Sequence, residues 1–333
     1  MLSTTAFITA TIVILALGFD FINGFHDTAN AIASSVSTRV LSPRTAIIMA
    51  SILNFLGAFI STKVAKTVGA DMVDPNSVPQ TVMISALIAA ILWNLITWYL
   101  GIPSSSSHAL IGGLIGSAVV FTGTVSIVHW SVFFTKVLLW LLISPVIGFF
   151  VGFIFMNLLN FIFRSTRPAT VTKIFSKAQI FSSALIAFNH GGNDAQKSMG
   201  IIAMSLLSGG LIQEFHVPIW VKLACAMSMA FGTSIGGWRI IKTIGQKMAK
   251  LTPVNGFAVD TSAAAVIFTA TMLHAPVSTT HIISTSIMGV GAAKRLSSVR
   301  WGVALNIVWT WVLTIPSCFI LSGIVISIIK LFS

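Results

Sequence analysis

The sequence predicts an all-α polytopic membrane protein built from two inverted repeats, each with a broken helix and a re-entrant helical hairpin. Three observations predict this fold: a membrane-like composition, polar motifs that recur along the chain, and apolar segments too short to cross a bilayer. Of the 333 residues, 56% are hydrophobic and only 8% are charged. Soluble domains are about 25% charged, so we expect the lipid bilayer to surround this chain.

Membrane topology explains the net charge of +12. Lys and Arg are spread over the short gaps between apolar segments, so we expect no nucleic-acid partner. If the N-terminus is outside, most basic residues fall on the inner side, as the positive-inside rule requires. We therefore predict a multi-pass inner-membrane protein with both termini outside. The inner basic residues are Arg39, Arg44, Arg164, Arg167, Lys173, Lys177, Arg239, Lys242, Lys247, Lys250, Lys294, Arg295 and Arg300.

Two of the apolar segments, at 109–121 and 282–290, are too short for a hydrocarbon core that needs about 20 helical residues. Each follows a run of proline and hydroxyl residues, PSSSSH at 103–108 and PVSTTH at 276–281. We therefore expect two helical hairpins with these runs at their tips. The other apolar segments lie at 4–33, 45–62, 82–100, 132–163, 180–207, 219–237, 257–273 and 301–329.

Two motifs recur in the same order in both halves. GFHDTANA at 24–31 matches GGNDAQKS at 191–198, and PSSSSH matches PVSTTH. Each half has an odd number of crossings in this topology, so the second half would be upside down relative to the first. Inverted repeats with discontinuous helices are typical of secondary transporters. We place the first repeat at 1–163, a basic cytoplasmic linker at 164–177 and the second repeat at 178–333.

The first motif forms a polar stripe inside a predicted span. Its residues follow at steps of three and four, which places them on one helix face. An ionisable residue in a span costs about 2.5–3.5 kcal/mol, so it indicates a functional site. The stripe holds Asp20, Asn23, Asp27 and Asn30 in the first half, and His190, Asp194 and Lys197 in the second.

The chemistry of the stripe favours a hard cation or a proton. Carboxylate, amide and backbone carbonyl oxygens suit sodium, magnesium or a proton, and the neighbouring glycines would let each helix unwind to offer carbonyls. The alternative is structural, with Asp194 and Lys197 neutralising each other and Asp27 paired with His26 or another residue. We expect no permanent metal site. We assign the coupling ion to Asn23, His26, Asp27, Asn193 and Asp194.

The hydroxyl runs predict an oxyanion site. A hydroxyl residue at a helix start caps the helix, and the backbone N–H groups and the positive dipole end behind it attract an oxyanion. Ordinary capping is the alternative, although four consecutive serines exceed what one cap needs. The candidate anion contacts are Asp27, Asn30, Ser105, Ser106, Ser107, Asp194, Ser278, Thr279 and Thr280, with His108, Lys197 and His281 behind them.

At these motifs the chain resembles the inorganic phosphate transporter (PiT) family. The resemblance rests on GFHDTANA, GIPSSSSH, FNHGGNDAQKSMG, GTSIGGWRIIKTIG, TPVNGFAVD and PVSTTH, in that order. It implies a symporter that takes up phosphate across the cytoplasmic membrane on a cation gradient. It also implies phosphate contacts from the hairpin hydroxyls and the paired aspartates. We further expect a homodimer, with phosphate and the lipid bilayer as its partners.

Position 26 departs from the Asn-Asp pattern of the family, which is intact at Asn193 and Asp194. The imidazole of His26 has no oxygen to give to sodium. With Lys197 at a position where asparagine is common, the chain resembles bacterial low-affinity members that are proton-coupled and accept a metal–phosphate complex. We therefore expect H+ as the coupling ion, with Na+ as the alternative. A divalent metal (Mg2+, Ca2+ or Zn2+) is the candidate co-transported ion.

Other functions compete with phosphate symport. A sulfate permease is the nearest, because both anions are tetrahedral, but an acceptor such as Asp27 favours phosphate, which can donate a hydrogen bond. A channel is a further alternative. An intramembrane hydrolase would use Ser107 with His108, yet adjacent residues on one helix point in different directions, and catalysis needs the base within reach of the nucleophile. We therefore expect no enzyme.

Overall fold

The computed structural model describes residues 2–332, without the side chains of Leu2, Ser3, Trp238 and residues 245–247. The inner-side Lys247 therefore lies outside the described side chains. Residues 2–332 contain helices and two isolated β-bridges but no strand. The all-α class is confirmed, because backbone groups inside a bilayer must find their hydrogen-bond partners within the helix itself.

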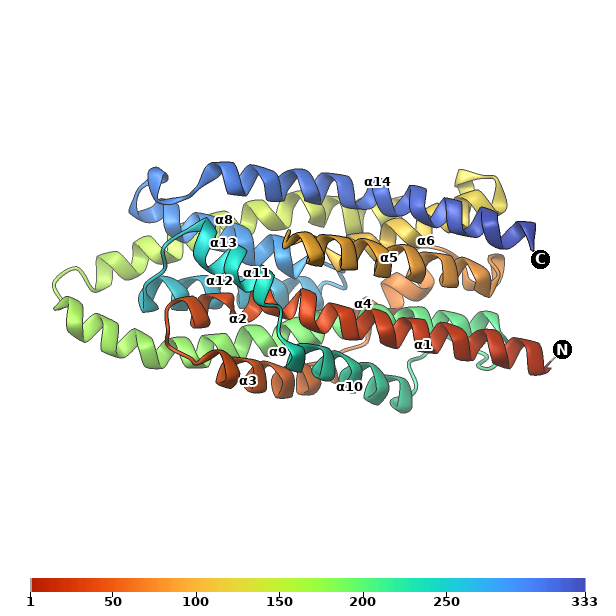
Figure 1. The fold of residues 1–333 in the computed structure, drawn as a ribbon, viewed down its shortest axis with the longest axis horizontal. Coiled ribbons are helices and arrows are strands. Elements are labelled where there is room, and N and C mark those ends of the chain that lie inside the picture. The colour runs from red at the N-terminus through yellow and green to blue at the C-terminus, as the bar shows by residue number, and fades with distance from the viewer. Residues whose placement is uncertain (1, 333) are drawn as a thin grey trace.

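Fourteen α-helices are described, joined by short turns and single-turn π- and 3-10 helices (Figure 1). The first half contains α1 (Leu2–His26), α2 (Thr28–Ser37), α3 (Pro43–Gly57), α4 (Lys63–Lys66), α5 (Gln80–Leu100), α6 (Ser106–Thr122), α7 (Trp130–Val132) and α8 (Leu139–Ile162). The second contains α9 (Pro168–Ser208), α10 (Ile219–Ile235), α11 (Trp238–Lys242), α12 (Pro253–Met272), α13 (Thr279–Lys294) and α14 (Trp301–Leu331).

Several helices are suited to cross a membrane. Four stretches are long and apolar enough, at Thr4–Ser37, Gln80–Leu100, Trp130–Ile162 and Trp301–Leu331. Helix α9 has 41 residues, or about 60 Å at 1.5 Å per residue, although its polar residues lower its hydropathy. Its first turns, residues 168–177, occupy most of the predicted linker, which is therefore helical beyond Arg167. These helices show that the chain is a multi-pass membrane protein.

The two expected hairpins are present. Helices α5 and α6 form the first and α12 and α13 the second, with α6 at 17 and α13 at 16 residues. Figure 1 shows α5 and α6 in the half of the molecule that carries both termini, and α12 and α13 in the other half. The two tips therefore approach the middle of the molecule from opposite ends, and their depth in a bilayer stays a prediction.

The repeat extends beyond the sequence motifs to the ends of the molecule. Val73 forms an isolated bridge with Val128, and Ala249 forms the matching bridge with Val299. A 3-10 turn precedes each bridge partner, at Val125–Ile127 and at Leu296–Ser298. The next tryptophan then donates its indole N–H to the start of that turn, Trp130 to Val125 at 2.8 Å and Trp301 to Leu296 at 3.0 Å. The two halves thus share one local design; inversion of the second stays a prediction.

The predicted helix break occurs in the first half only. Helix α1 ends at His26 and α2 begins at Thr28, with Asp27 as the single residue between them. Helix α9 instead runs unbroken through Asn193 and Asp194, so the prediction of a second broken helix was wrong. The helix can stay continuous there because Asp194 pairs within it, with Lys197 at i+3 and His190 at i−4.

The glycines beside the motifs pack helices together and do not unwind them, contrary to the expectation. A Cβ atom on Gly24 would lie 2.3 Å from the Met229 carbonyl oxygen, and one on Gly191 would lie 2.2 Å from the Asn54 carbonyl oxygen. Both positions require glycine because the backbones of α1 and α10, and of α9 and α3, are in direct contact. These close contacts hold the two polar stripes in place.

Candidate functional site

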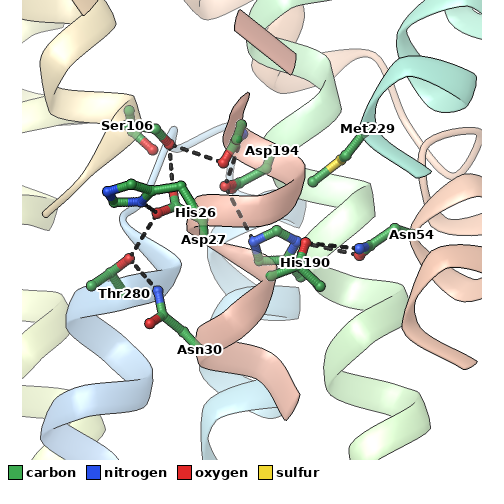
Figure 2. Close-up of polar contacts among 12 residues, drawn as sticks. His26, Asp27, Asn30, Asn54, Ser106, His190, Asp194, Met229 and Thr280 are labelled. Carbon is green, nitrogen blue, oxygen red and sulfur yellow. Dashed lines mark hydrogen bonds and ion pairs between the residues drawn. The ribbon is translucent and has the colours of Figure 1, made fainter. Parts of the chain in front are cut away.

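The predicted site residues gather where the two hairpin tips meet the α1–α2 junction and the middle of α9 (Figure 2). Each of them is at most 3% exposed, so the structure is closed around the cluster. Figure 2 shows Asp27 between Ser106 of the first tip and Thr280 of the second. Residues from all four segments therefore contact one another, although they lie far apart in the sequence.

The first carboxylate, Asp27, is surrounded by hydrogen-bond donors. His26 Nδ1 lies 2.7 Å from Asp27 Oδ1, and Ser106 donates its hydroxyl to Asp27 Oδ2. Thr280 Oγ1 lies 3.4 Å from Asp27 Oδ1. The same Ser106 hydroxyl is 3.2 Å from Asn23 Oδ1. Asp27 thus has an imidazole on one oxygen and hydroxyls from both hairpins.

The second carboxylate, Asp194, has a fixed cation instead. Lys197 Nζ lies 2.5 Å from Asp194 Oδ1, and His190 Nε2 lies 3.5 Å from Asp194 Oδ2. Asn23 of the first half donates its amide N–H to Asp194 Oδ2 at 3.4 Å. The structural alternative, an Asp194–Lys197 pair, is therefore present as a contact, and it lies within the predicted site.

Each half also reaches across to the hairpin of the other half. Asn30 donates to Thr280 Oγ1 at 2.7 Å, and Lys197, at the matching position of the second motif, donates to Ser107 Oγ. Ser107 and Thr280 occupy the same place in their hairpin runs. Two cross-contacts of the same kind therefore fix the tips on the opposite stripes, and they surround the two aspartates with groups that can bind an oxyanion.

The hydroxyls of the two runs divide into caps and site groups. Ser105 accepts the backbone N–H of His108 at 3.3 Å, and Ser278 accepts that of His281 at 3.3 Å. Ordinary capping therefore accounts for these two hydroxyls. Thr279 Oγ1 is buried without a hydrogen-bond partner in the described structure. The other three candidate hydroxyls donate within the protein, Ser106 and Thr280 to Asp27 and Ser107 to the Val277 carbonyl oxygen, so an anion would have to replace these bonds.

The two closing histidines lie together behind the tips. The rings of His108 and His281 have centroids 4.9 Å apart, and His281 also stacks on Trp311 at 3.9 Å. Neither ring contacts a carboxylate among the described ion pairs. Their predicted place behind the hydroxyls agrees with this packing.

Two threonines are absent from the predicted site. Thr97 Oγ1 lies 3.1 Å from His26 Nε2, and Thr271 Oγ1 accepts the amide of Asn193 at 2.9 Å. Each threonine lies in the helix that leads to a hairpin tip, Thr97 six residues before Pro103 and Thr271 five residues before Pro276. Because these spacings differ by one residue, the sequence repeat does not pair the two threonines and carried no signal for them. They set the orientation of the residue next to each aspartate.

Two other buried carboxylates border the cluster. Asp20 accepts the Ser198 hydroxyl at 2.6 Å, and Asp260 accepts the hydroxyls of Ser34 at 2.5 Å and Ser183 at 2.6 Å. Asp20 belongs to the predicted stripe, whereas Asp260 lies in the apolar segment 257–273, where an ionisable residue is itself a signal. Polar groups thus extend along the α1–α2 face in both directions from Asp27.

The arrangement can bind an oxyanion and hold a proton. It offers hydroxyl and amide donors, two carboxylate acceptors, one ammonium, and an imidazole beside each carboxylate. No group of three or more His, Cys, Asp or Glu side chains that would hold a metal is present in the described part of the chain. The donors suit a tetrahedral oxyanion that also has a hydroxyl to give.

Comparisons with known proteins agree on one class. A model of the phosphate transporter family matches residues 23–170 and 164–322. The "probable low-affinity inorganic phosphate transporter" of Bacillus subtilis is 50% identical, covering 97% of this chain and 98% of the relative. The protein of the same name from Rhizobium meliloti is 47% identical, with 94% of each chain covered. A solved structure titled "The sodium-dependent phosphate transporter" has a TM-score of 0.87 at 28% identity, covering 98% of this chain and 100% of its own.

Proposed function

This chain belongs to the phosphate transporter family, and we propose that it imports inorganic phosphate together with protons through the cluster around Asp27 and Asp194. The reciprocal pair of cross-contacts, Asn30 with Thr280 and Lys197 with Ser107, is the observation that carries the proposal. Both hairpins converge there on one pair of carboxylates, as a single transported anion would require.

Phosphate fits the donors and acceptors of the cluster. The hydroxyls of Ser106, Ser107, Thr279 and Thr280 supply donors, and the Lys197 ammonium supplies a positive charge. A carboxylate of Asp27 or Asp194 accepts the hydroxyl proton that HPO4 carries and sulfate lacks. The relatives from Bacillus subtilis and Rhizobium meliloti carry names of phosphate transporters.

Proton coupling is favoured by what already contacts the two carboxylates. His26 Nδ1 lies 2.7 Å from Asp27, and Lys197 Nζ lies 2.5 Å from Asp194. A sodium ion bound at either carboxylate would meet a nitrogen donor where it needs an oxygen ligand. The His26–Asp27 pair can instead hold and pass on a proton, because a ring nitrogen of imidazole can either carry a proton or accept one.

The proposal includes the location, orientation and oligomeric state of the transporter. We place the chain in the cytoplasmic membrane as a homodimer, with both termini outside and the opposite end of the molecule on the cytoplasmic side. A divalent metal would enter only as part of a metal–phosphate complex, with no permanent ligands in the protein. Phosphate uptake that is unchanged by chelation of Mg2+, Ca2+ and Zn2+ would remove the metal from the proposal.

Purified protein in sodium-free liposomes tests the coupling. Labelled phosphate should accumulate when the outside is acidic, and a protonophore should abolish that accumulation. Excess sulfate should compete weakly. Strong competition by sulfate would make this a sulfate permease, and uptake that needs sodium and ignores the pH gradient would make it a sodium symporter.

A sodium symporter is the second candidate, because the solved structure with a TM-score of 0.87 is titled a sodium-dependent phosphate transporter. That structure is 28% identical to this chain. The histidine at position 26 is the specific feature that separates the two candidates in this sequence.

A further inference from the structure

We propose that a basic pocket at the end of the molecule opposite the two termini is a second oxyanion site, which binds the phosphoryl group of a small ligand. The pocket lies between the start of α12, the end of α13 and the start of α14. Figure 1 shows these helix ends together at that end of the molecule. Lys294 follows Thr280 by fourteen positions in α13, or about 20 Å along the helix. The pocket is therefore separate from the cluster around Asp27.

Four cationic side chains line this pocket. It has a volume of about 370 Å3, and its walls include Lys250, Lys294, Arg295 and Arg300. Neutral polar groups complete the lining, among them Thr252 and Asn255. The volume is at the lower end of the range of ligand pockets, which suits a single phosphoryl group with its waters. Arg and Lys are the side chains that bind such oxyanions most strongly.

Among the described side chains, none supplies a counter-charge to these cations. The ion pairs among the described side chains are His26–Asp27, His190–Asp194 and Lys197–Asp194, and none includes a residue of the pocket. No acidic residue lines the pocket either. Four positive charges that converge without a carboxylate repel one another, so an anion bound among them would relieve that repulsion.

The fold does not require these charges. The opposite end of the molecule has the same bridge and the same 3-10 turn, formed by the first half. The residue after the bridge at Ala249 is Lys250, and the matching residue after Val73 is Asp74. Likewise, Arg300 follows Val299, whereas His129 follows Val128. The same local structure is therefore built with acidic or weakly basic residues.

Membrane topology alone does not explain the pocket. The positive-inside rule asks for Lys and Arg in the gaps on one side, and scattered residues such as Lys173 and Lys177 of the predicted linker meet that demand. All four lysines, Lys173, Lys177, Lys250 and Lys294, are exposed, but only Lys250 and Lys294 line the pocket. The positive-inside rule does not require four cationic side chains to line one cavity, so their presence there needs another explanation. The phosphoryl group can come from free phosphate or from the headgroup of an anionic lipid.

Chemical modification of lysines in the intact protein tests this site. The protein is placed in nanodiscs of phosphatidylcholine, treated briefly with N-acetoxysuccinimide, and the acetylation rate of each lysine is measured by mass spectrometry. Inorganic phosphate at about ten times its dissociation constant should slow acetylation of Lys250 and Lys294 by about tenfold. Lys173 and Lys177 serve as matched controls on the same molecule, and their rates should not change.

Two further samples identify the source of the phosphoryl group. If a lipid headgroup is the ligand, nanodiscs with phosphatidylglycerol should protect Lys250 and Lys294 over the control lysines without added phosphate. The double variant Arg295→Gln with Arg300→Gln should lose the protection, whereas Arg164→Gln with Arg167→Gln should keep it. The proposal would be overturned if neither phosphate nor phosphatidylglycerol slowed acetylation of Lys250 and Lys294. It would also be overturned if either probe slowed all four lysines by the same factor.

The site is also tested independently of transport. In the Asp27→Asn variant, phosphate should still protect Lys250 and Lys294, because the pocket shares no residue with the cluster around Asp27. Loss of protection in that variant would show that the lysines respond to the central cluster, and it would overturn a separate site. A wild-type protein that transports no phosphate but shows the protection would leave the pocket standing and refute the proposed function.

Discussion

The two halves of the central cluster share one plan but neutralise their aspartates differently. In the first half, Asp27 contacts the imidazole of His26 at 2.7 Å, while the matching position in the second half is the uncharged Asn193. In the second half, Asp194 contacts the ammonium of Lys197 at 2.5 Å, while the matching position in the first half is the uncharged Asn30. Each half thus carries its basic group at the position where the other half has an amide.

This difference gives the two halves different chemistry. The ammonium of Lys197 has three N–H donors and no acceptor, so it can attract an anion. A ring nitrogen of His26 can either donate or accept a proton, so it can exchange one with Asp27. In the proposed function, the half with His26 therefore exchanges the proton and the half with Lys197 attracts the anion. Substitutions that break either half should have different consequences.

Removal of either carboxylate should have the largest effect. Asp27→Asn and Asp194→Asn should each abolish accumulation of phosphate in proteoliposomes, because the first removes the proton partner and the second removes the counter-charge of Lys197. Both proteins should still be present in the membrane. Glu214→Gln, which removes one carboxylate from an exposed loop away from the cluster, serves as a matched control. Near-normal uptake by both aspartate variants would refute the assigned roles.

The two aspartate variants should differ in stability. Asp194→Asn leaves the buried Lys197 without its partner, and breaking such a pair costs about 3–5 kcal/mol. Asp27→Asn leaves no lysine without its partner, and the new amide oxygen can still accept a hydrogen bond from His26 or Ser106, so the loss of stability should be smaller. Thermal unfolding in detergent measures both. Adding Lys197→Met to Asp194→Asn should recover stability without recovering uptake, and a double variant as unstable as Asp194→Asn alone would contradict the buried pair.

Removal of hairpin hydroxyls should weaken the affinity for phosphate. Ser106→Ala combined with Thr279→Ala removes one donor from each tip, at about 1.5–3 kcal/mol for a hydrogen bond to a charged group. The half-saturation concentration for phosphate should rise at least tenfold. Ser144→Ala is the matched control, because this buried hydroxyl lies in α8 and has no described partner. An unchanged half-saturation concentration in the double variant would remove both hydroxyls from the site.

The capping serines should show the smallest effect. Ser105→Ala and Ser278→Ala each remove a side chain that accepts a backbone N–H at 3.3 Å. Loss of an N-cap costs about 1 kcal/mol, so both variants should unfold at a slightly lower temperature. Their half-saturation concentrations should stay near that of the wild type. A large rise in that concentration for either variant would return these two hydroxyls to the phosphate site.

The sequence predicts the composition of the cluster better than its geometry. Matching motifs identify Asp27, Asp194 and both hydroxyl runs, because a repeat preserves order and spacing. The motifs do not show that α9 stays continuous, since that depends on the pairing of Asp194 with Lys197 along the helix. Glycine predicts flexibility when read alone, but at Gly24 and Gly191 tertiary contacts decide its role. Contacts between distant segments, such as Asn30 with Thr280, need the folded chain.

The His26→Asn variant tests proton coupling at His26. Phosphate uptake is measured for the wild type and for His26→Asn in the same liposomes, with either a pH gradient or a sodium gradient imposed. The wild type should respond to the pH gradient and not to sodium. His26→Asn, which restores an amide oxygen beside Asp27, should lose the pH response and gain a sodium response. Sodium-driven uptake by the wild type with no response to the pH gradient would contradict the assignment.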